Sequence, residues 1–179
     1  SCNLRFWSRM SFYYNKISDL ITQVTNEDDM LQFENTDDVV SKGLEFEMRA
    51  DSLYGVSFYL NMNYQSSKYI DSSEELSNSP KFVGNLGVNV PVWDDKVFLS
   101  TESRYVGRRM SIEPGIYIEP YFVSNLSIFA KNIHENWNIA ARIYNILNNK
   151  YYDPGSGEHV MTGIQQDGRK YLVEVIFRF

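Results

Sequence analysis

The sequence feature that most constrains the fold is an alternation of apolar and polar residues with period two, which recurs along nearly the whole chain. In the clearest run, Val56, Phe58 and Leu60 alternate with Ser57 and Tyr59. Successive side chains of a β-strand point to opposite faces of a sheet. The period therefore predicts strands with one apolar face and one more polar face.

The alternation predicts an all-β chain of eight strands. We place them at about residues 4–24, 38–50, 55–69, 81–92, 96–109, 120–132, 136–150 and 169–179. Phe98 and Phe129 fall on the polar side of their segments, and Ile143 beside Tyr144 suggests a bulge or a change of register. Because no helical repeat, linker or low-complexity stretch interrupts the pattern, we expect a single domain over residues 1–179.

The connections between these segments alternate strictly between long and short. The short ones lie at 51–54, 93–95 and 133–135, and the long ones at 27–37, 70–80, 110–119 and 151–168. Transmembrane barrels have short turns at one end and long loops at the other, whereas a Greek-key sandwich has no reason to sort its loops. Most segments also reach the roughly 9–11 residues that a tilted strand needs to cross a bilayer. An antiparallel up-and-down transmembrane β-barrel, or a portion of one, is therefore expected.

Charged residues on the polar side of the strands support this interpretation. Glu45, Glu47 and Arg49 alternate on one strand, and Glu102 and Arg104 on another. Such charges would be very costly in a sandwich core but stay solvated or paired in a lumen, so we expect all five to face the lumen. Aromatic residues near strand ends fit the girdles at the two lipid–water boundaries: Tyr54, Tyr64, Tyr69, Trp93, Tyr105, Tyr121, Trp137 and Tyr151.

Composition excludes several other classes of protein. No stretch approaches the roughly 18 apolar residues of a spanning helix. The net charge is −6, so we expect no nucleic-acid partner, because nucleic-acid binders usually carry a basic face. The single cysteine, Cys2, excludes an intramolecular disulfide framework and a thiolate-rich metal site. No cofactor is expected.

The sequence offers little that supports an enzyme. His134 and His159 fall in a turn and a loop without a nucleophile at motif spacing, and the Gly155–Gly157 stretch lacks the strand-to-helix context of a nucleophile elbow. Glu158 beside His159 is more typical of a solvated loop than of a metal site. The same alternatives, a solvated loop or attraction of cationic ligands such as calcium, apply to an acidic group in the first long loop: Glu27, Asp28, Asp29, Asp37 and Asp38.

Several motifs resemble the C-terminal barrel portion of TonB-dependent outer-membrane receptors. Residues 11–21 (SFYYNKISDLI) and 41–47 (SKGLEFE) resemble two strands of that family, and residues 78–81 (NSPK) resemble its Asn-x-Pro strand start. Residues 141–154 (ARIYNILNNKYYDP) resemble its penultimate strand, and the chain closes with QDGRKY and a terminal Phe-Arg-Phe. The motifs occur in family order across nearly the whole length.

The resemblance implies energised import of a scarce nutrient such as an iron–siderophore, cobalamin or haem, in the outer membrane of a Gram-negative bacterium. In that family a barrel of about 22 strands holds an N-terminal plug, through which an inner-membrane energy-coupling complex acts. This sequence shows neither plug nor coupling box and opens inside an apolar–aromatic run. We therefore expect the last eight strands of a larger barrel, with its own plug and remaining strands as partners.

Two alternatives remain open at this stage. One is a complete small eight-stranded outer-membrane barrel with a structural or adhesion role, whose interior would be filled by side chains. The other is a soluble β-sandwich binding module. A ladder between the segments around Phe6 and Val175 would favour the small barrel, whereas unpaired edges would favour the receptor fragment.

The last strand resembles the terminal signal by which the outer-membrane assembly machinery recognises its substrates. Apolar residues occupy every second position back from the terminal aromatic: Tyr171, Val173, Val175, Phe177 and Phe179. An amphipathic last strand without any signal role is the alternative. The lipid bilayer and the assembly machinery are therefore expected partners.

Overall fold

The computed structural model describes residues 4–26, 30–52, 54–113, 115–134, 136–155 and 159–179. Within these ranges every regular element is a β-strand, and no helix is long and apolar enough to span a membrane. The all-β prediction is confirmed.

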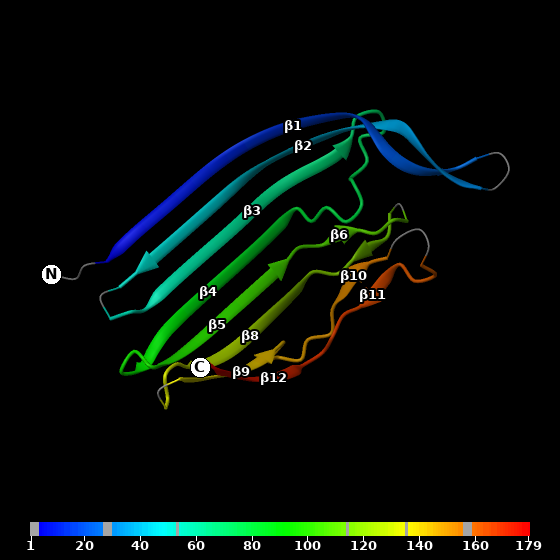
Figure 1. Cartoon of the computed structure of the whole chain (residues 1–179). Helices are drawn as coiled ribbons and strands as arrows, with labels where there is room; N and C mark the ends of the chain where they lie inside the picture. Colours follow the sequence, from blue (N-terminus) through cyan, green and yellow to red (C-terminus); the bar gives the residue numbers. More distant parts are fainter. Residues whose placement is uncertain (1–3, 27–29, 53, 114, 135, 156–158) are drawn as a thin grey trace.

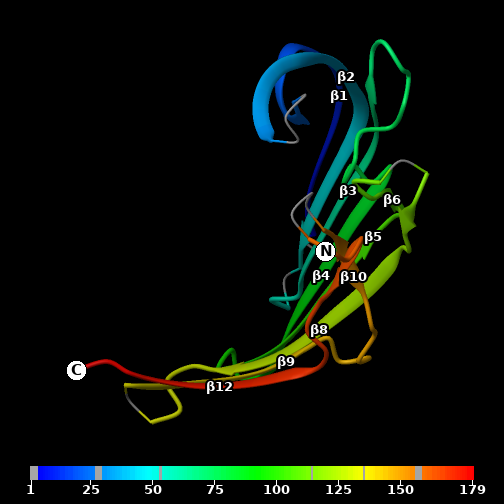
Figure 2. The same cartoon turned by 90° about the vertical axis from the view of Figure 1, so that its right-hand side faces the viewer.

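One large antiparallel sheet makes up most of the molecule (Figure 1). Its eight strands lie side by side in chain order, so each inner strand hydrogen-bonds to the large strand before it and to the large strand after it. They are β1 (Arg5–Thr25), β2 (Leu31–Asp51), β3 (Ser57–Tyr69), β4 (Phe82–Trp93), β5 (Val97–Val106), β8 (Tyr121–Ala130), β9 (Trp137–Tyr144) and β12 (Lys170–Phe177). Seen along its edge, the sheet is curved like part of a cylinder wall (Figure 2).

The two edges of this sheet do not meet. Among the described residues β1 pairs only with β2, and β12 only with β9, so no ladder joins the segments around Phe6 and Val175. An eight-stranded barrel closes its own sheet and has no such edges. The open edges argue against the small complete barrel, and the absence of a second packed sheet in the described chain argues against a sandwich.

Tight turns gather at one end of the sheet and loops at the other (Figure 1). In the β4–β5 turn, Asp94 and Asp95 both have positive φ, 42° and 52°, and the Lys96 amide donates to the Trp93 carbonyl at 2.7 Å. Two consecutive residues with positive φ form the hairpin turn whose twist matches that of paired strands. The turn end therefore satisfies its backbone locally.

The expected first long loop is wrong in extent. β1 continues as far as Thr25 and β2 already begins at Leu31, so the two strands form a paired ribbon that extends past the other strands (Figure 1). The ladder is interrupted only by register shifts between Ile17 and Ile21, where Asp19 has a φ of 56°. The ribbon is long because pairing resumes beyond this irregularity. The alternation of the sequence breaks there, so the continuation was not predicted.

The expected strand over residues 136–150 is too long, and the bulge at Ile143 and Tyr144 is absent. β9 ends at Tyr144 with regular pairing on both sides. Asn145 then takes a φ of 49° and turns the chain out of the sheet.

Four short strands also lie in segments that were expected to be loops or loop borders: β6 (Arg109–Met110), β7 (Tyr117–Ile118), β10 (Tyr152–Pro154) and β11 (Gly163–Gln165). They form two small ribbons, β6–β7 and β10–β11.

Buried side chains are few, and several of them lie at the loop end rather than along the sheet. Val106, Met110 and Ile118 are almost fully buried there, together with Ser111. By contrast, large apolar side chains along the strands are exposed: Phe12 by 80% and Val173 by 70%. A contiguous exposed apolar surface of this kind marks a face that meets a partner or a membrane.

Candidate functional site: the polar face and its cavities

The register of the strands places the five charges singled out from the sequence on one face. Glu47 pairs with Asn61, Asn61 with Asn85, and Asn85 with Arg104. Glu45 and Arg49 lie two residues on either side of Glu47, and Glu102 lies two residues from Arg104. Directly paired residues, and residues two apart on a strand, share a face. We call this the polar face.

Four members of the expected terminal signal lie on the opposite face. Tyr171 pairs with Ile143, which pairs with Leu126, and this row continues through Thr101 and Val88 to Phe58. We call this the apolar face; its other members on β12 are Val173, Val175 and Phe177. Phe179 lies past the end of β12 and is fully exposed.

Two tyrosines lie flat over glycines on the polar face and reach the strand beyond. Tyr59 pairs with Gly87, which pairs with Glu102, and the Tyr59 hydroxyl donates to Glu102 Oε1 at 2.7 Å. A Cβ added at Gly87 would lie 2.0 Å from the Tyr59 ring. The glycine is thus the residue that allows the ring to cross one strand and bond to the next.

The second tyrosine repeats this arrangement. Tyr13 pairs with Gly43, Gly43 with Gln65, and the Tyr13 hydroxyl donates to Gln65 Oε1 at 3.0 Å. A Cβ at Gly43 would meet the Tyr13 ring at 2.7 Å and the Tyr64 carbonyl oxygen also at 2.7 Å. Each tyrosine therefore fastens three neighbouring strands on the same face.

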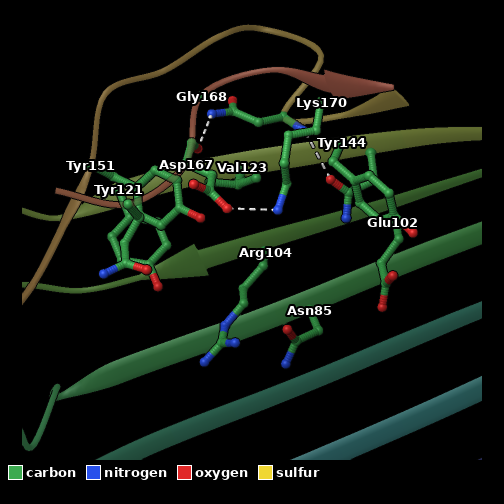
Figure 3. Close-up of a pocket in the computed structure, with 13 residues that line it drawn as sticks. Asn85, Glu102, Arg104, Tyr121, Val123, Tyr144, Tyr151, Asp167, Gly168 and Lys170 are labelled. Atoms are coloured by element: carbon green, nitrogen blue, oxygen red, sulfur yellow. Dashed lines mark hydrogen bonds and ion pairs between the residues drawn. The ribbon is translucent and has the colours of Figure 1, made fainter. Parts of the chain in front are cut away.

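A cavity of about 480 Å³ opens on the polar face near its loop end (Figure 3). Arg104 and Glu102 project from β5, and the Lys170 ammonium bonds Asp167 Oδ2 at 2.6 Å above them. The Arg104 guanidinium makes no hydrogen bond or ion pair with any described residue. The remaining lining is amide and tyrosine side chains with few apolar groups: Asn85, Tyr121, Val123, Asn125, Tyr144, Asn145, Tyr151 and Gln166. We call this the wall cavity.

A second cavity of about 470 Å³ adjoins it toward the turn end and shares Glu102, Asn125 and Tyr144 with it. Arg142 lines this cavity and bonds Glu174 Oε2 at 3.2 Å. Side chains of the polar face therefore line both cavities. Such a surface provides hydrogen-bond donors, hydrogen-bond acceptors and charges of both signs. It is suited to contact with water, a polar ligand or a folded polar domain.

A third cavity of about 370 Å³ lies at the loop end, between the two short ribbons. Tyr121 and Tyr151 line both this loop cavity and the wall cavity, and their rings pack with centroids 4.5 Å apart. The tyrosine pair thus separates the two cavities.

The structure offers no metal centre in the residues it describes, since no group of three or more His, Cys, Asp or Glu lies close enough to hold an ion there. Asp37 and Asp38 border a cavity of about 190 Å³ with Asp71 and Glu74. Asp38 also accepts from the Asp19 amide at 3.2 Å and pairs with Lys16 at 3.5 Å. The other acidic residues of this loop, Glu27, Asp28 and Asp29, and also Glu158, lie outside the described residues.

Two of the sequence motifs meet at the loop end. The NSPK stretch supplies Asn78, whose amide donates to the Met110 carbonyl at 2.9 Å. The penultimate-strand motif supplies Asn145, 2% exposed, whose side chain bonds the backbone of Asn149 at both its amide and its carbonyl, at 3.0 and 2.8 Å. Arg109 links these two segments through Asn78 and Asp153. It was not predicted from the sequence, because an arginine directly after a strand carries no recognisable signal.

Comparison with known proteins identifies the family. The model of the TonB-dependent receptor-like β-barrel matches residues 3–146. The chain belongs to the TonB-dependent receptor family. Members of this family are transporters of the Gram-negative outer membrane rather than enzymes, and TonB supplies their energy. A search of curated protein sequences gave no match.

Solved structures of TonB-dependent receptors share the fold. The copper transporter OprC covers 98% of this chain with a TM-score of 0.75 at 18% identity. The ferric-catecholate import receptor Fiu from E. coli K12 covers 98% of this chain with a TM-score of 0.76 at 14% identity. The ferric yersiniabactin uptake receptor FyuA from Yersinia pestis covers 95% of this chain with a TM-score of 0.78 at 16% identity. The chain spans 29%, 25% and 27% of those three proteins. At these identities the likeness concerns the fold alone.

Proposed function

We propose that this chain is the C-terminal wall of an outer-membrane receptor that imports a scarce nutrient. Residues 1–179 would form about the last eight strands of a barrel of about 22 strands. The observation that carries the proposal is the open, curved, meandering sheet, whose two edges have no strand partner among the described residues and whose faces differ in polarity. Exposed edges are a liability that neighbouring strands remove.

The contrast between the two faces supports one orientation of the wall in the membrane. The apolar face would meet lipid, and the polar face, with Glu45, Glu47, Arg49, Glu102 and Arg104, would line the lumen. Charges are far less costly in a solvated or plug-filled lumen than on a lipid face, where arginine or lysine costs about 2–4 kcal/mol at the midplane. The tight turns would then lie on the periplasmic side and the loops outside the cell.

The substrate class follows by analogy from the similar structures. OprC is a copper transporter, and Fiu and FyuA take up ferric chelates, so a metal ion or a metal chelate is the substrate we propose. The chain would supply one part of the passage. A plug and an inner-membrane energy-coupling complex, acting through segments outside this chain, would supply gating and energy.

The terminal strand would serve as the assembly signal. Tyr171, Val173, Val175 and Phe177 form an apolar row on an edge strand that pairs with β9 on one side only among the described residues, and Phe179 would complete that row. An edge strand with free backbone groups is suited to recognition by strand addition. Deleting Phe179 is expected to lower the amount of heat-modifiable receptor in the outer membrane, and unchanged levels would contradict this role.

Uptake by living cells tests the proposed function. The receptor that carries this chain is expressed in a strain without other receptors for the compounds tested, and accumulation of radioactive iron or copper is measured with a panel of ferric and cupric chelates. We expect saturable uptake of at least one compound, abolished when TonB is deleted. Uptake of none of the panel, or uptake independent of TonB, would contradict the proposal.

A further inference from the structure

Arg109 is a buried charge that connects three segments at the loop end. Its side chain is 8% exposed and lies in β6, within the β5–β8 connection. Nη2 bonds Asp153 Oδ1 at 2.6 Å and the Tyr152 carbonyl at 3.0 Å, both in the β9–β12 connection. Nη1 donates to Asn78 Oδ1 at 3.3 Å, in the β3–β4 connection. One guanidinium thus holds its own connection against two others.

The same guanidinium also contacts the tyrosine pair between the wall and loop cavities. Its carbon lies 5.5 Å from the centre of the Tyr121 ring, within the range of a cation–π contact. Tyr151 packs on Tyr121, and the residues that follow Tyr151 are those that Arg109 binds. Both rings of the partition are therefore fixed through Arg109.

A buried arginine is stable only while its partners are in place. Arg109 Nε has no hydrogen-bond partner in the described structure, so the two terminal nitrogens carry all the compensation for burying the charge. Removing one member of a buried pair leaves an uncompensated charge, which is strongly destabilising. The segments are held in common because each supplies part of that compensation.

We propose that Arg109 is a positioning residue that joins the three connections into one body and holds the Tyr121–Tyr151 partition closed. Movement of the β9–β12 connection away from Arg109 would separate the two rings and join the loop cavity to the wall cavity. One route between the loop end and the lumen side of this part of the wall would then depend on this contact. Its purpose as a gate rests on the proposed transport function, but the coupling itself does not.

Distances between spin labels test the coupling. In a background without reactive cysteines, which requires Cys2→Ser here, labels are placed at Asp71→Cys and Val160→Cys, exposed positions in the β3–β4 and β10–β11 connections. We expect one narrow distance distribution in the parent receptor. Arg109→Gln should broaden it about twofold or more, as separate populations appear. Asp153→Asn, which leaves the bonds to Asn78 and Tyr152, should broaden it less.

Two matched variants complete this experiment. Arg109→Lys keeps the positive charge near Asp153 but cannot bond all three segments at once, because an ammonium is a compact point charge and not a planar guanidinium. The distance distribution should therefore be narrower than in Arg109→Gln but wider than in the parent receptor. Lys16→Gln removes the exposed pair with Asp38 and should leave the distribution unchanged. A parent-like distribution in Arg109→Gln and in Asp153→Asn, with both receptors folded by heat-modifiability, would overturn the coupling.

Thiol accessibility tests the partition. A cysteine at Val123, which lines the wall cavity, is exposed to a membrane-impermeant reagent added outside the cell. Tyr151→Ala, which removes one ring of the partition, and Arg109→Gln should each increase the modification rate on the order of tenfold. An increase in Tyr151→Ala but not in Arg109→Gln would overturn the role of Arg109, and no increase in either would overturn the partition. Neither readout measures uptake, so failure here is distinct from failure of the proposed function.

Discussion

At the turn end of the sheet each pair of strands is joined by a few residues that bond among themselves, whereas at the loop end separate connections depend on one another. The Asp94–Asp95 turn closes with one backbone hydrogen bond to its own strand. The loop end instead relies on buried side chains such as Arg109 and Asn145, which bond residues far along the chain. The turn end is therefore determined by local conformation and the loop end by tertiary contacts.

Between the two ends, tyrosine rings pack closely over glycines of neighbouring strands. Disrupting this packing should have the largest effect on stability. In Gly43→Val the new side chain would collide with the Tyr64 carbonyl oxygen as well as with Tyr13, so a backbone must move. We expect a loss of unfolding free energy at or above the upper end of about 1–3 kcal/mol, measured by urea unfolding of receptor refolded into lipid vesicles.

Gly87→Val is the informative companion, because there the new side chain would collide closely only with the Tyr59 ring. The ring can rotate away at the cost of its bond to Glu102, so the loss should be smaller than for Gly43→Val. Equal losses in the two variants would show that the close approach to the backbone at Gly43 is not the deciding factor.

At the loop end, Asn145→Ala should have a smaller but clear effect. The change removes the side-chain bonds to Asn149 and Asp167 and leaves alanine at a φ of 49°. We expect a loss of about 2 kcal/mol and faster proteolytic cleavage within the β9–β12 connection.

Asn145→Gly separates the two contributions at this position. Glycine tolerates the positive φ but cannot make the side-chain bonds. If the bonds dominate, Asn145→Gly should be cleaved as fast as Asn145→Ala; cleavage at the parent rate would mean that the backbone conformation alone sustains the loop end.

At the turn end, Asp95→Gly should have the smallest effect and the opposite sign. Asp95 has a φ of 52° in a turn that favours glycine at its second central position. Relief of the left-handed conformation should stabilise the receptor by up to about 1 kcal/mol, seen as a higher urea midpoint. A lower midpoint would show that the Asp95 side chain contributes more than its backbone conformation costs.

The same contrast explains how much was predictable from the sequence. Alternation located the eight large strands and the common face of Glu45, Glu47, Arg49, Glu102 and Arg104, because period two depends only on neighbours. The paired ribbon beyond Asp19 and the early end of β9 at Asn145 were missed, because both depend on single residues with positive φ. Arg109 was missed as well, since its partners Asn78 and Asp153 lie 31 and 44 residues away.

We expect the apolar face to meet lipid and the polar face to meet water, and a nitroxide scan along β3 in lipid vesicles tests this orientation. Labels are placed one at a time at residues 58–63 of the receptor that carries this chain, and their accessibility to oxygen and to a water-soluble nickel chelate is measured. We predict that accessibility alternates with period two, with oxygen favoured at Phe58, Leu60 and Met62 and the nickel chelate at Tyr59, Asn61 and Asn63. The reverse phase, or no alternation, would contradict it.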